Sequence, residues 1–201
     1  MTAVSRQSLR QIIRQKRRDL SSHAQQEAAM ALNMRLQENS RIQHTKTIAI
    51  YLTNDGELDT TPFIHWCWQQ GKTVCLPRIH PFNPHHLLFL KYQAHSKMLP
   101  NQYGIPEPQL NCLNVVPLKD IDIIFTPLVA FDSDGARLGM GGGFYDRTLS
   151  QWFQSFKEDE DTSLWPIGLA HDCQLVEKIP TEHWDVPIPE IYTPSKHYQF
   201  I

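Results

Sequence analysis

The segment DIDIIFTPLVAFD at positions 120–132 constrains the fold more than any other part of the chain. It is nearly continuous in apolar residues, a pattern typical of a central strand that is covered on both faces of a parallel sheet. Other segments with the composition of strands alternate with helical patterns: TIAIYL at 47–52, TVCLPRI at 73–79, HHLLFLKY at 85–92 and PIGLAH at 166–171. This alternation predicts an α/β fold over residues 1–201, as a single three-layer domain with a mostly parallel central sheet flanked by helices.

Two helices are expected before the first strand. Residues 5–18 predict a basic N-terminal helix, because Arg6, Arg10 and Arg14 recur every four residues and share one face. Residues 22–38 predict a second helix whose inner face consists of alanine and leucine side chains. The arginines of the first helix either form a solvated face or hold an anion.

The balanced charge of the chain argues against partners that are recruited by a general electrostatic field. The formal net charge is −2, so neither nucleic acid nor membrane is an expected partner, and an anion site must be a local cluster of charge. No apolar run has the length of a signal-peptide core or of a membrane span. The four cysteines form no CxxC pair and are interpreted as reduced, mostly buried thiols. We expect a cytoplasmic monomer.

The segment GARLGMGGGFYDRTL at 135–149 holds five glycines in nine positions. It lies between the expected central strand and a helix that is expected to begin near Tyr145. Ligands of open α/β sheets bind beyond the carboxyl ends of the strands, where glycines let the backbone approach a ligand closely. The N-terminus of the helix and the charges of Arg137 and Arg147 would both attract an anion. This combination is typical of a polyphosphate site.

Two alternatives remain open for this segment. It matches neither GxxxxGK[ST] nor GxGxxG, because Phe144 occupies the last glycine position of the second motif when it is counted from Gly139. A glycine-rich turn without a ligand is therefore possible from the residues alone. Asp146 either binds Mg²⁺ beside the phosphates or is an acid in the first helical turn that complements the helix dipole.

The same segment resembles the signature of the 5-formyltetrahydrofolate cyclo-ligase family, also called methenyltetrahydrofolate synthetases. The resemblance covers nearly the whole chain. Further matching segments follow in the order of the family: SLRQIIRQKRRDLS, YLTNDGELDT, LPRI, YGIPEP, DIIFTPLVAFDSDG and EHWDVPIPEIYT. Some members carry a lysine where this chain has Gly142.

The resemblance implies an ATP- and Mg²⁺-dependent enzyme that acts on a reduced folate. Such an enzyme cyclises 5-formyltetrahydrofolate to 5,10-methenyltetrahydrofolate and releases ADP and phosphate. The formyl oxygen is a poor leaving group, and phosphoryl transfer from ATP makes it a good one before N10 of the folate attacks the formyl carbon. This chemistry needs positioning and charge neutralisation more than a protein nucleophile.

The resemblance also assigns residues. It places ATP at Arg6, Arg10, Arg137, Leu138, Gly139, Met140, Gly141, Gly142, Gly143, Phe144 and Tyr145. It places the folate at Leu52, Glu57, Tyr103, Met140, Gly141, Gly142, Gly143 and Phe144. It makes Asp146 and Asp185 metal ligands, and Arg137 and Asp146 the catalytic residues. From the residues alone, Glu57 could equally be a solvated loop acid and Tyr103 a packed loop tyrosine.

Three other functions remain to be distinguished. A related α/β enzyme could act on sugar phosphates or acyl-CoA, since a fold does not fix a function. A non-catalytic regulator could bind nucleotide or folate, although it would need no pair of acids such as Asp146 and Asp185. Nucleic-acid binding through RQKRR at 14–18 would need a broad basic face, which the balanced charge does not favour.

Overall fold

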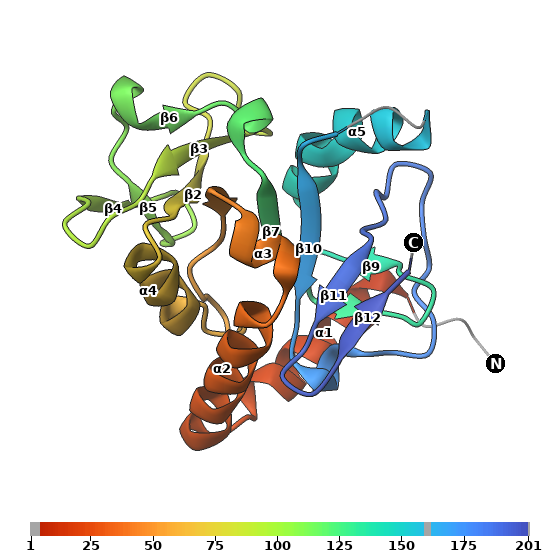
Figure 1. The fold of residues 1–201 in the computed structure, drawn as a ribbon. Coiled ribbons are helices and arrows are strands. Elements are labelled where there is room, and N and C mark those ends of the chain that lie inside the picture. The colour runs from red at the N-terminus through yellow and green to blue at the C-terminus, as the bar shows by residue number, and fades with distance from the viewer. Residues whose placement is uncertain (1–4, 159–161, 201) are drawn as a thin grey trace.

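The computed structural model of the protein describes residues 5–158 and 162–200. Within these residues, the main sheet has eight strands in the order β12-β11-β10-β7-β1-β2-β3-β6 (Figure 1). Its strands are β1 (Thr47–Ala49), β2 (Thr73–Ile79), β3 (Leu87–Lys91), β6 (Val115–Val116), β7 (Ile123–Pro127), β10 (Trp165–Leu169), β11 (Glu190–Tyr192) and β12 (His197–Gln199). The five from β11 to β2 are mutually parallel, and the outer strands β12, β3 and β6 pair antiparallel. The predicted α/β fold with a mostly parallel sheet is confirmed.

Helices cover the sheet on both faces. They are α1 (Arg6–Arg18), α2 (Ser22–Gln37), α3 (Ser40–His44), α4 (Thr61–Gln69) and α5 (Phe144–Lys157), with short 3₁₀ turns at η1 (Cys112–Asn114), η2 (Leu118–Asp120) and η3 (Asp172–Gln174). The two helices expected before the first strand are confirmed almost residue for residue. One core cluster joins α2, α3 and α4 to one face of the sheet, and a second joins α5 to the other face.

The central strands supply both cores through the two-residue period of a strand. Ile48 and Ile123 belong to the first cluster, whereas their neighbours Ala49 and Ile124 belong to the second. All four are completely buried. Burying an isoleucine side chain contributes about 1.5–3 kcal/mol, so apolar residues on both faces explain why these strands form the centre of the sheet.

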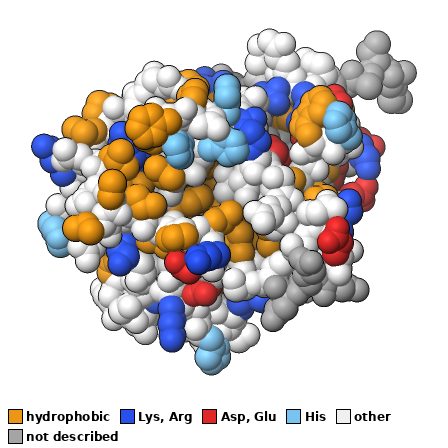
Figure 2. Space-filling view, turned by 90° about the horizontal axis from the view of Figure 1, so that it is seen from above, with side chains coloured by type: hydrophobic (Ala, Val, Ile, Leu, Met, Phe, Trp, Pro, Cys, Tyr) orange, Lys and Arg blue, Asp and Glu red, His pale blue; other side chains and the backbone are white. Residues whose placement is uncertain are grey.

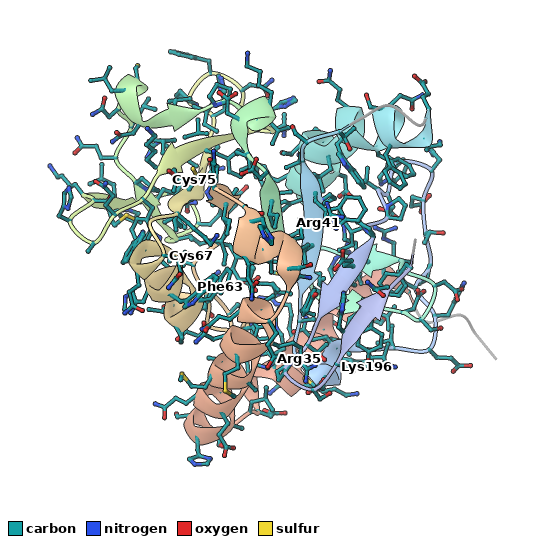
Figure 3. The ribbon with its side chains drawn as sticks, in the orientation of Figure 1. Arg35, Arg41, Phe63, Cys67, Cys75 and Lys196 are labelled. Atoms are coloured by element: carbon teal, nitrogen blue, oxygen red, sulfur yellow. The ribbon has the colours of Figure 1, made fainter. Side chains whose placement is uncertain are left out.

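The cysteines agree with the sequence interpretation in part. Cys67 and Cys75, which are labelled in Figure 3, lie on α4 and β2. Both are buried, and the described part of the chain contains no disulfide. Burial raises the pKa of each of these two thiols to about 12. Cys112 is exposed and Cys173 is partly exposed, so only half of the cysteines are core residues.

The expected long strand at 120–132 is split in two. β7 ends at Pro127, which has no N–H to continue a ladder. The chain then turns out of the sheet, and β8 (Ala130–Phe131) pairs antiparallel with β9 (Arg137–Leu138). This two-stranded hairpin positions the glycine segment at the carboxyl end of β7.

The tail beyond β10 adds two further strands, β11 and β12, to the edge of the main sheet. The segment YGIPEP belongs to a second hairpin, in which β4 (Met98–Pro100) pairs antiparallel with β5 (Pro106–Pro108). No helix in the described ranges is both long enough and apolar enough to cross a membrane.

The strand order creates a crevice at the carboxyl edge of the sheet. β2 lies on one side of β1 and β7 on the other, so the connections from neighbouring strands leave in opposite directions. Loops 50–60 and 128–143 follow β1 and β7 at this point. Ligands of open α/β sheets bind at such switch points, and both loops contain residues that the sequence singled out.

Candidate functional site

The glycine segment lies between two adjacent cavities. The first has a volume of about 520 Å³ and the second about 690 Å³. Gly139, Gly142, Gly143 and Asp146 line both of them. A ligand in each cavity would therefore meet the same short stretch of backbone and the same carboxylate.

Arg137 and Asp146 form an ion pair beneath the glycine segment. Arg137 Nη2 donates to Asp146 Oδ1 at 2.8 Å, and the arginine side chain is only 3% exposed. Burial lowers the pKa of Arg137, while the charges of Asp146 and Asp185 oppose that shift. Within residues 5–158 and 162–200, Arg137 Nε has no hydrogen-bond partner. A buried cation with a free donor at a cavity wall can accept an anion at low reorganisation cost.

Three glycines of the segment have backbone conformations that other residues adopt only with strain. Gly135 has φ +82°, Gly141 has φ +102° and Gly143 has φ +64°, and Gly143 immediately precedes α5. A side chain at Gly142 would meet a different obstacle, because its Cβ would lie 2.8 Å from the ring of Phe144. Arg147 donates to Gly142 O and places its guanidinium beside the loop. A cation is therefore present here although residue 142 carries no side chain.

Helix α1 contributes arginines to the second cavity. Arg6 forms two hydrogen bonds with the carboxylate of Asp185, at 2.5 and 2.9 Å. Burial raises the pKa of Asp185, but the hydrogen bond from Arg6 and that from the N–H of Glu182 outweigh this and lower it. Arg10 Nε donates to Gly139 O at 2.8 Å. The two arginines thus contact the site, and the alternative of a solvated helix face does not apply to them.

The two acids expected to hold a metal lie within electrostatic reach of the same two arginines. Asp146 and Asp185 both raise the pKa of Arg6 and both oppose the lowering of the pKa of Arg137. Mg²⁺ in proteins takes one or two carboxylates and completes its shell with water and phosphate oxygens. The donor set fits such an ion, although Arg6 engages both oxygens of Asp185. Within the described residues, no three His, Cys, Asp or Glu side chains gather as a metal cluster.

Glu57 lies in the wall of the first cavity, on the loop that follows β1. Burial raises its pKa to about 7, and the nearby charge of Arg17 only partly opposes that shift. Its Oε2 accepts a hydrogen bond from Asn54 N at 3.2 Å. Leu52 lines the same cavity, and Tyr103 lies at its rim with 63% of the residue exposed. The three residues that were assigned to the folate and not also to ATP therefore line the same cavity.

Leu138 differs from its neighbours in the expected ATP-binding segment. Its side chain is completely buried in a cluster with α1 residues Leu9 and Ile13. β9 alternates its side chains between two faces, so Arg137 and Leu138 point in opposite directions. Among the described residues lining either cavity, Arg137 is present and Leu138 is not. The other ten residues assigned to ATP, and all eight assigned to the folate, line at least one of the two cavities.

Several lining residues were not identified from the sequence. In the first cavity these include Tyr51, Asn54, Leu76, Asn101 and Glu107, and in the second Lys157 and Trp184. Glu107 offered a signal, because an acid between two prolines in a strand is unusual. Its buried carboxylate accepts hydrogen bonds from Ile79 N at 3.0 Å and Asn101 Nδ2 at 2.8 Å, and these bonds join two walls of the cavity.

Fold and site together define an α/β protein with two adjacent cavities at the switch point of its sheet and a glycine-rich helix N-terminus between them. The profile of the 5-formyltetrahydrofolate cyclo-ligase family matches residues 2–194. This chain therefore belongs to the 5-formyltetrahydrofolate cyclo-ligase family.

Individual relatives agree with this assignment. The chain is 48% identical to the 5-formyltetrahydrofolate cyclo-ligase of Escherichia coli K12 over 189 residues, which are 94% of this chain and 100% of the relative. It is 47% identical to the enzyme of that name from Haemophilus influenzae, covering 95% and 98% of the two chains. The solved structure of Aquifex aeolicus 5,10-methenyltetrahydrofolate synthetase superimposes with a TM-score of 0.81 at 26% identity, covering 97% and 92%.

Proposed function

We propose that this protein cyclises 5-formyltetrahydrofolate to 5,10-methenyltetrahydrofolate with ATP and Mg²⁺, releasing ADP and phosphate. The observation that carries the proposal is the pair of cavities that share Gly139, Gly142, Gly143 and Asp146. A reaction between two substrates needs them to meet at one wall, within contact distance of the transferred group. Family membership and the names of the relatives support the same reaction.

The first cavity suits the reduced folate. Apolar side chains such as Leu52 and Leu76 can pack on the pterin ring. Glu57, when ionised, can accept hydrogen bonds from the N–H and amino donors of the pterin. The hydroxyls of Tyr51 and Tyr145, whose pKa values burial raises, remain protonated donors at neutral pH. Tyr103 at the rim can cover the bound ring.

The second cavity suits a nucleotide triphosphate. Arg6, Arg10 and Arg147 line it together with the glycines that precede the N-terminus of α5. Full and partial positive charges thus face a space into which the backbone of Gly141–Gly143 can approach phosphates closely. Trp184 at the same cavity offers an aromatic surface, 58% exposed, for a base.

The reaction proceeds in two balanced steps. The formyl oxygen attacks the γ-phosphorus of ATP, and ADP leaves. N10 then attacks the formyl carbon, the carbon–oxygen bond breaks, phosphate departs with that oxygen, and N10 loses its proton. Mg²⁺, held by Asp146 and Asp185 when bound, would neutralise charge on the phosphates. Arg137 stabilises charge that develops on the transferred group, and closure of the cavity excludes water from the activated carbon.

A mixing assay tests this function directly. Purified protein is incubated with Mg²⁺, ATP and 5-formyltetrahydrofolate, and the near-ultraviolet absorbance of the methenyl product is followed. We expect growth of this absorbance that depends on ATP and is abolished by a chelator. A flat trace from folded protein that binds both ligands would instead support a non-catalytic regulator, and binding of ATP alone would support an enzyme with another acceptor.

The nucleic-acid alternative has little support. Three arginines of RQKRR, at positions 14, 17 and 18, are paired with a single aspartate, Asp55. On the face drawn in Figure 2, basic and acidic side chains are interspersed among hydrophobic ones. A monomeric state and a cytoplasmic location remain predictions, the first of which light scattering on purified protein can check.

A further inference from the structure

Asp55 is the meeting point of three arginines from one helix. Arg14 Nε lies 2.6 Å from Asp55 Oδ2, Arg17 Nη2 lies 3.1 Å from the same oxygen, and Arg18 Nη2 lies 2.6 Å from Oδ1. Arg17 is completely buried, and the carboxylate itself is 14% exposed. Arg17 Nη2 also donates to the backbone oxygen of Asp55 at 3.0 Å. The last turns of α1 thus hold this aspartate by both side chain and backbone.

The backbone at Asp55 has a left-handed conformation, which aspartate adopts more readily than most residues but still at a cost in energy. Among the residues that the structure describes, Asp55 is the non-glycine residue with a positive φ, of +52°. Gly56 follows with φ +71°. An ordinary residue in this region costs about 1–3 kcal/mol and persists where surrounding contacts impose it. A Cβ at Gly56 would lie 3.3 Å from the backbone of Arg17. The loop therefore lies directly against α1.

The charge balance favours an ionised Asp55. Burial alone would raise its pKa, but hydrogen bonds from Arg14 and Arg18 outweigh this and hold the pKa below its usual value of 3.8. The buried guanidinium of Arg17 needs such an anion, because an unpaired buried charge is strongly unfavourable. Its remaining acceptor is Leu128 O at 3.3 Å, on the loop after β7.

The loop that Asp55 anchors carries the carboxylate of the first cavity. Glu57 N donates to Asn54 O at 3.0 Å, and Asn54 N donates to Glu57 Oε2. Asp55 lies between these two partners, so its position sets the direction of the Glu57 side chain. Asn54, Asp55 and Glu57 all line the first cavity.

The other end of α1 borders the second cavity. Arg6 and Arg10 line that cavity, one to three turns before the arginines that hold Asp55. A helix of 13 residues is about 20 Å long and transmits a shift along its axis. Leu9 and Ile13 pack it onto the β8–β9 hairpin, which leads into the glycine segment. One helix thus contacts both cavities.

We propose that Asp55 is a positioning residue for Glu57. Through Asp55, helix α1 couples the two cavities, so that nucleotide bound in the second cavity strengthens folate binding in the first. This inference rests on the proposed function, because it takes the two cavities to hold those two ligands. A nucleotide that contacts Arg6 and Arg10 fixes α1, and the folate then meets a loop that is already ordered. Thermodynamic linkage requires the converse effect of equal size.

The test compares folate binding with and without nucleotide. Calorimetry measures the Kd of 5-formyltetrahydrofolate at pH 8, alone and with Mg²⁺ and a non-hydrolysable ATP analogue at saturation. For the unmodified protein we expect the analogue to tighten folate binding about five- to tenfold, within the usual range of coupling between sites. For Asp55→Asn we expect folate Kd to rise about tenfold and the tightening to fall below twofold. The analogue's own Kd should change less than threefold.

Matched variants separate positioning from a general loss of charge or of stability. Asp134→Asn removes an aspartate from an exposed pair with Lys178. It should leave unchanged both the folate Kd and the tightening of folate binding by the analogue. Arg14→Gln removes a 34% exposed partner of Asp55 while Arg17 and Arg18 keep theirs, so it should fold and shift folate binding about threefold in the same direction. It decides the matter if Asp55→Asn fails to fold.

The outcomes are distinguishable. If the unmodified protein binds neither ligand, the proposed function fails and this inference fails with it. If it binds both, and the folded variants of Asp55 and Arg14 keep its folate Kd and its response to the analogue, the inference is overturned while the proposed function stands. A lowered melting temperature with unchanged binding constants would show that the arginines of α1 serve stability alone.

Discussion

Replacing Asp146 with asparagine should lower stability slightly and turnover strongly. The ion pair with Arg137 gives the expected loss of stability. Asparagine keeps an oxygen that can accept the 2.8 Å hydrogen bond from Arg137 but carries no charge. Removing one partner of a buried ion pair costs about 3–5 kcal/mol when nothing replaces it. Asparagine retains the hydrogen bond, and the charge of Asp185 still acts on Arg137, so we expect a smaller fall in the free energy of unfolding, of about 1–2 kcal/mol.

Denaturant unfolding measures this loss, and a thermal melt should show a shift of about 2–8 °C for a chain of this length. Asp134→Asn is the matched control, because its partner Lys178 is exposed and such pairs contribute about 0–1 kcal/mol. A loss of about 1–2 kcal/mol leaves Asp146→Asn folded at 25 °C. Its turnover can therefore be compared directly with that of the unmodified protein.

Turnover should fall much further than stability. Asp146 borders both cavities, and removing one preorganised electrostatic group at a reacting centre typically costs about a hundredfold or more. We also expect the Mg²⁺ concentration for half-maximal rate to rise. The absorbance assay over a Mg²⁺ series reports both values. A variant with unchanged rate and unchanged Mg²⁺ requirement would refute the metal role, and unchanged unfolding free energy would refute the energetic reading of the pair.

Three further predictions concern titration and packing. Glu57 has a pKa raised to about 7 by burial, so folate binding that needs the carboxylate should weaken about tenfold for each pH unit below 7; calorimetry should show this slope in the protein and lose it in Glu57→Gln. His171 has a pKa lowered to about 4, first by burial and then by Arg17. Because the unfolded chain binds this proton more readily, stability should be complete above pH 6.5 and fall by up to about 3 kcal/mol toward pH 4; urea unfolding should show a shallower slope in His171→Asn, and an equal slope would contradict the assignment. A Cβ at Gly168 would lie 2.6 Å from Ile188 and 2.8 Å from Ile191, so Gly168→Ala should cost about 1–3 kcal/mol of unfolding free energy, and an unchanged denaturation midpoint would show that β10 has room to shift.

The parts of the fold that the sequence predicts are those that local composition determines. The strand at 73–79 and the first two helices follow from residues within one segment, and they are present almost as predicted. The single strand predicted over 120–132 was wrong, because β7 ends at Pro127. The apolar residues that follow it, Leu128 and Val129, are buried in loop structure rather than in a strand, and a hydropathy pattern does not distinguish these two kinds of burial.

Contacts between distant segments explain why the site was less predictable than the fold. Arg6 and Asp185 are 179 positions apart and form one ion pair, and neither residue identifies the other by spacing. The glycine segment is different, because its glycines, its arginines and the helix that follows are consecutive in the sequence. Their combination can be interpreted without knowing which distant segments contact them. The prediction of an anion site in this segment therefore needed no knowledge of the fold, whereas the position of the second cavity beside it did.

Helix α1 shows how far periodicity alone can lead. The four-residue repeat correctly placed Arg6, Arg10 and Arg14 on one helical face, but it could not say what that face contacts. In the structure Arg6 pairs with a carboxylate from the tail, and Arg14 with one from the loop after β1. A surface helix with this pattern would need only solvent. Each arginine instead meets an acid or a backbone oxygen beside one of the two cavities, so α1 borders both of them. Changing Asp55 therefore tests the proposed coupling between the cavities more directly than changing any single arginine.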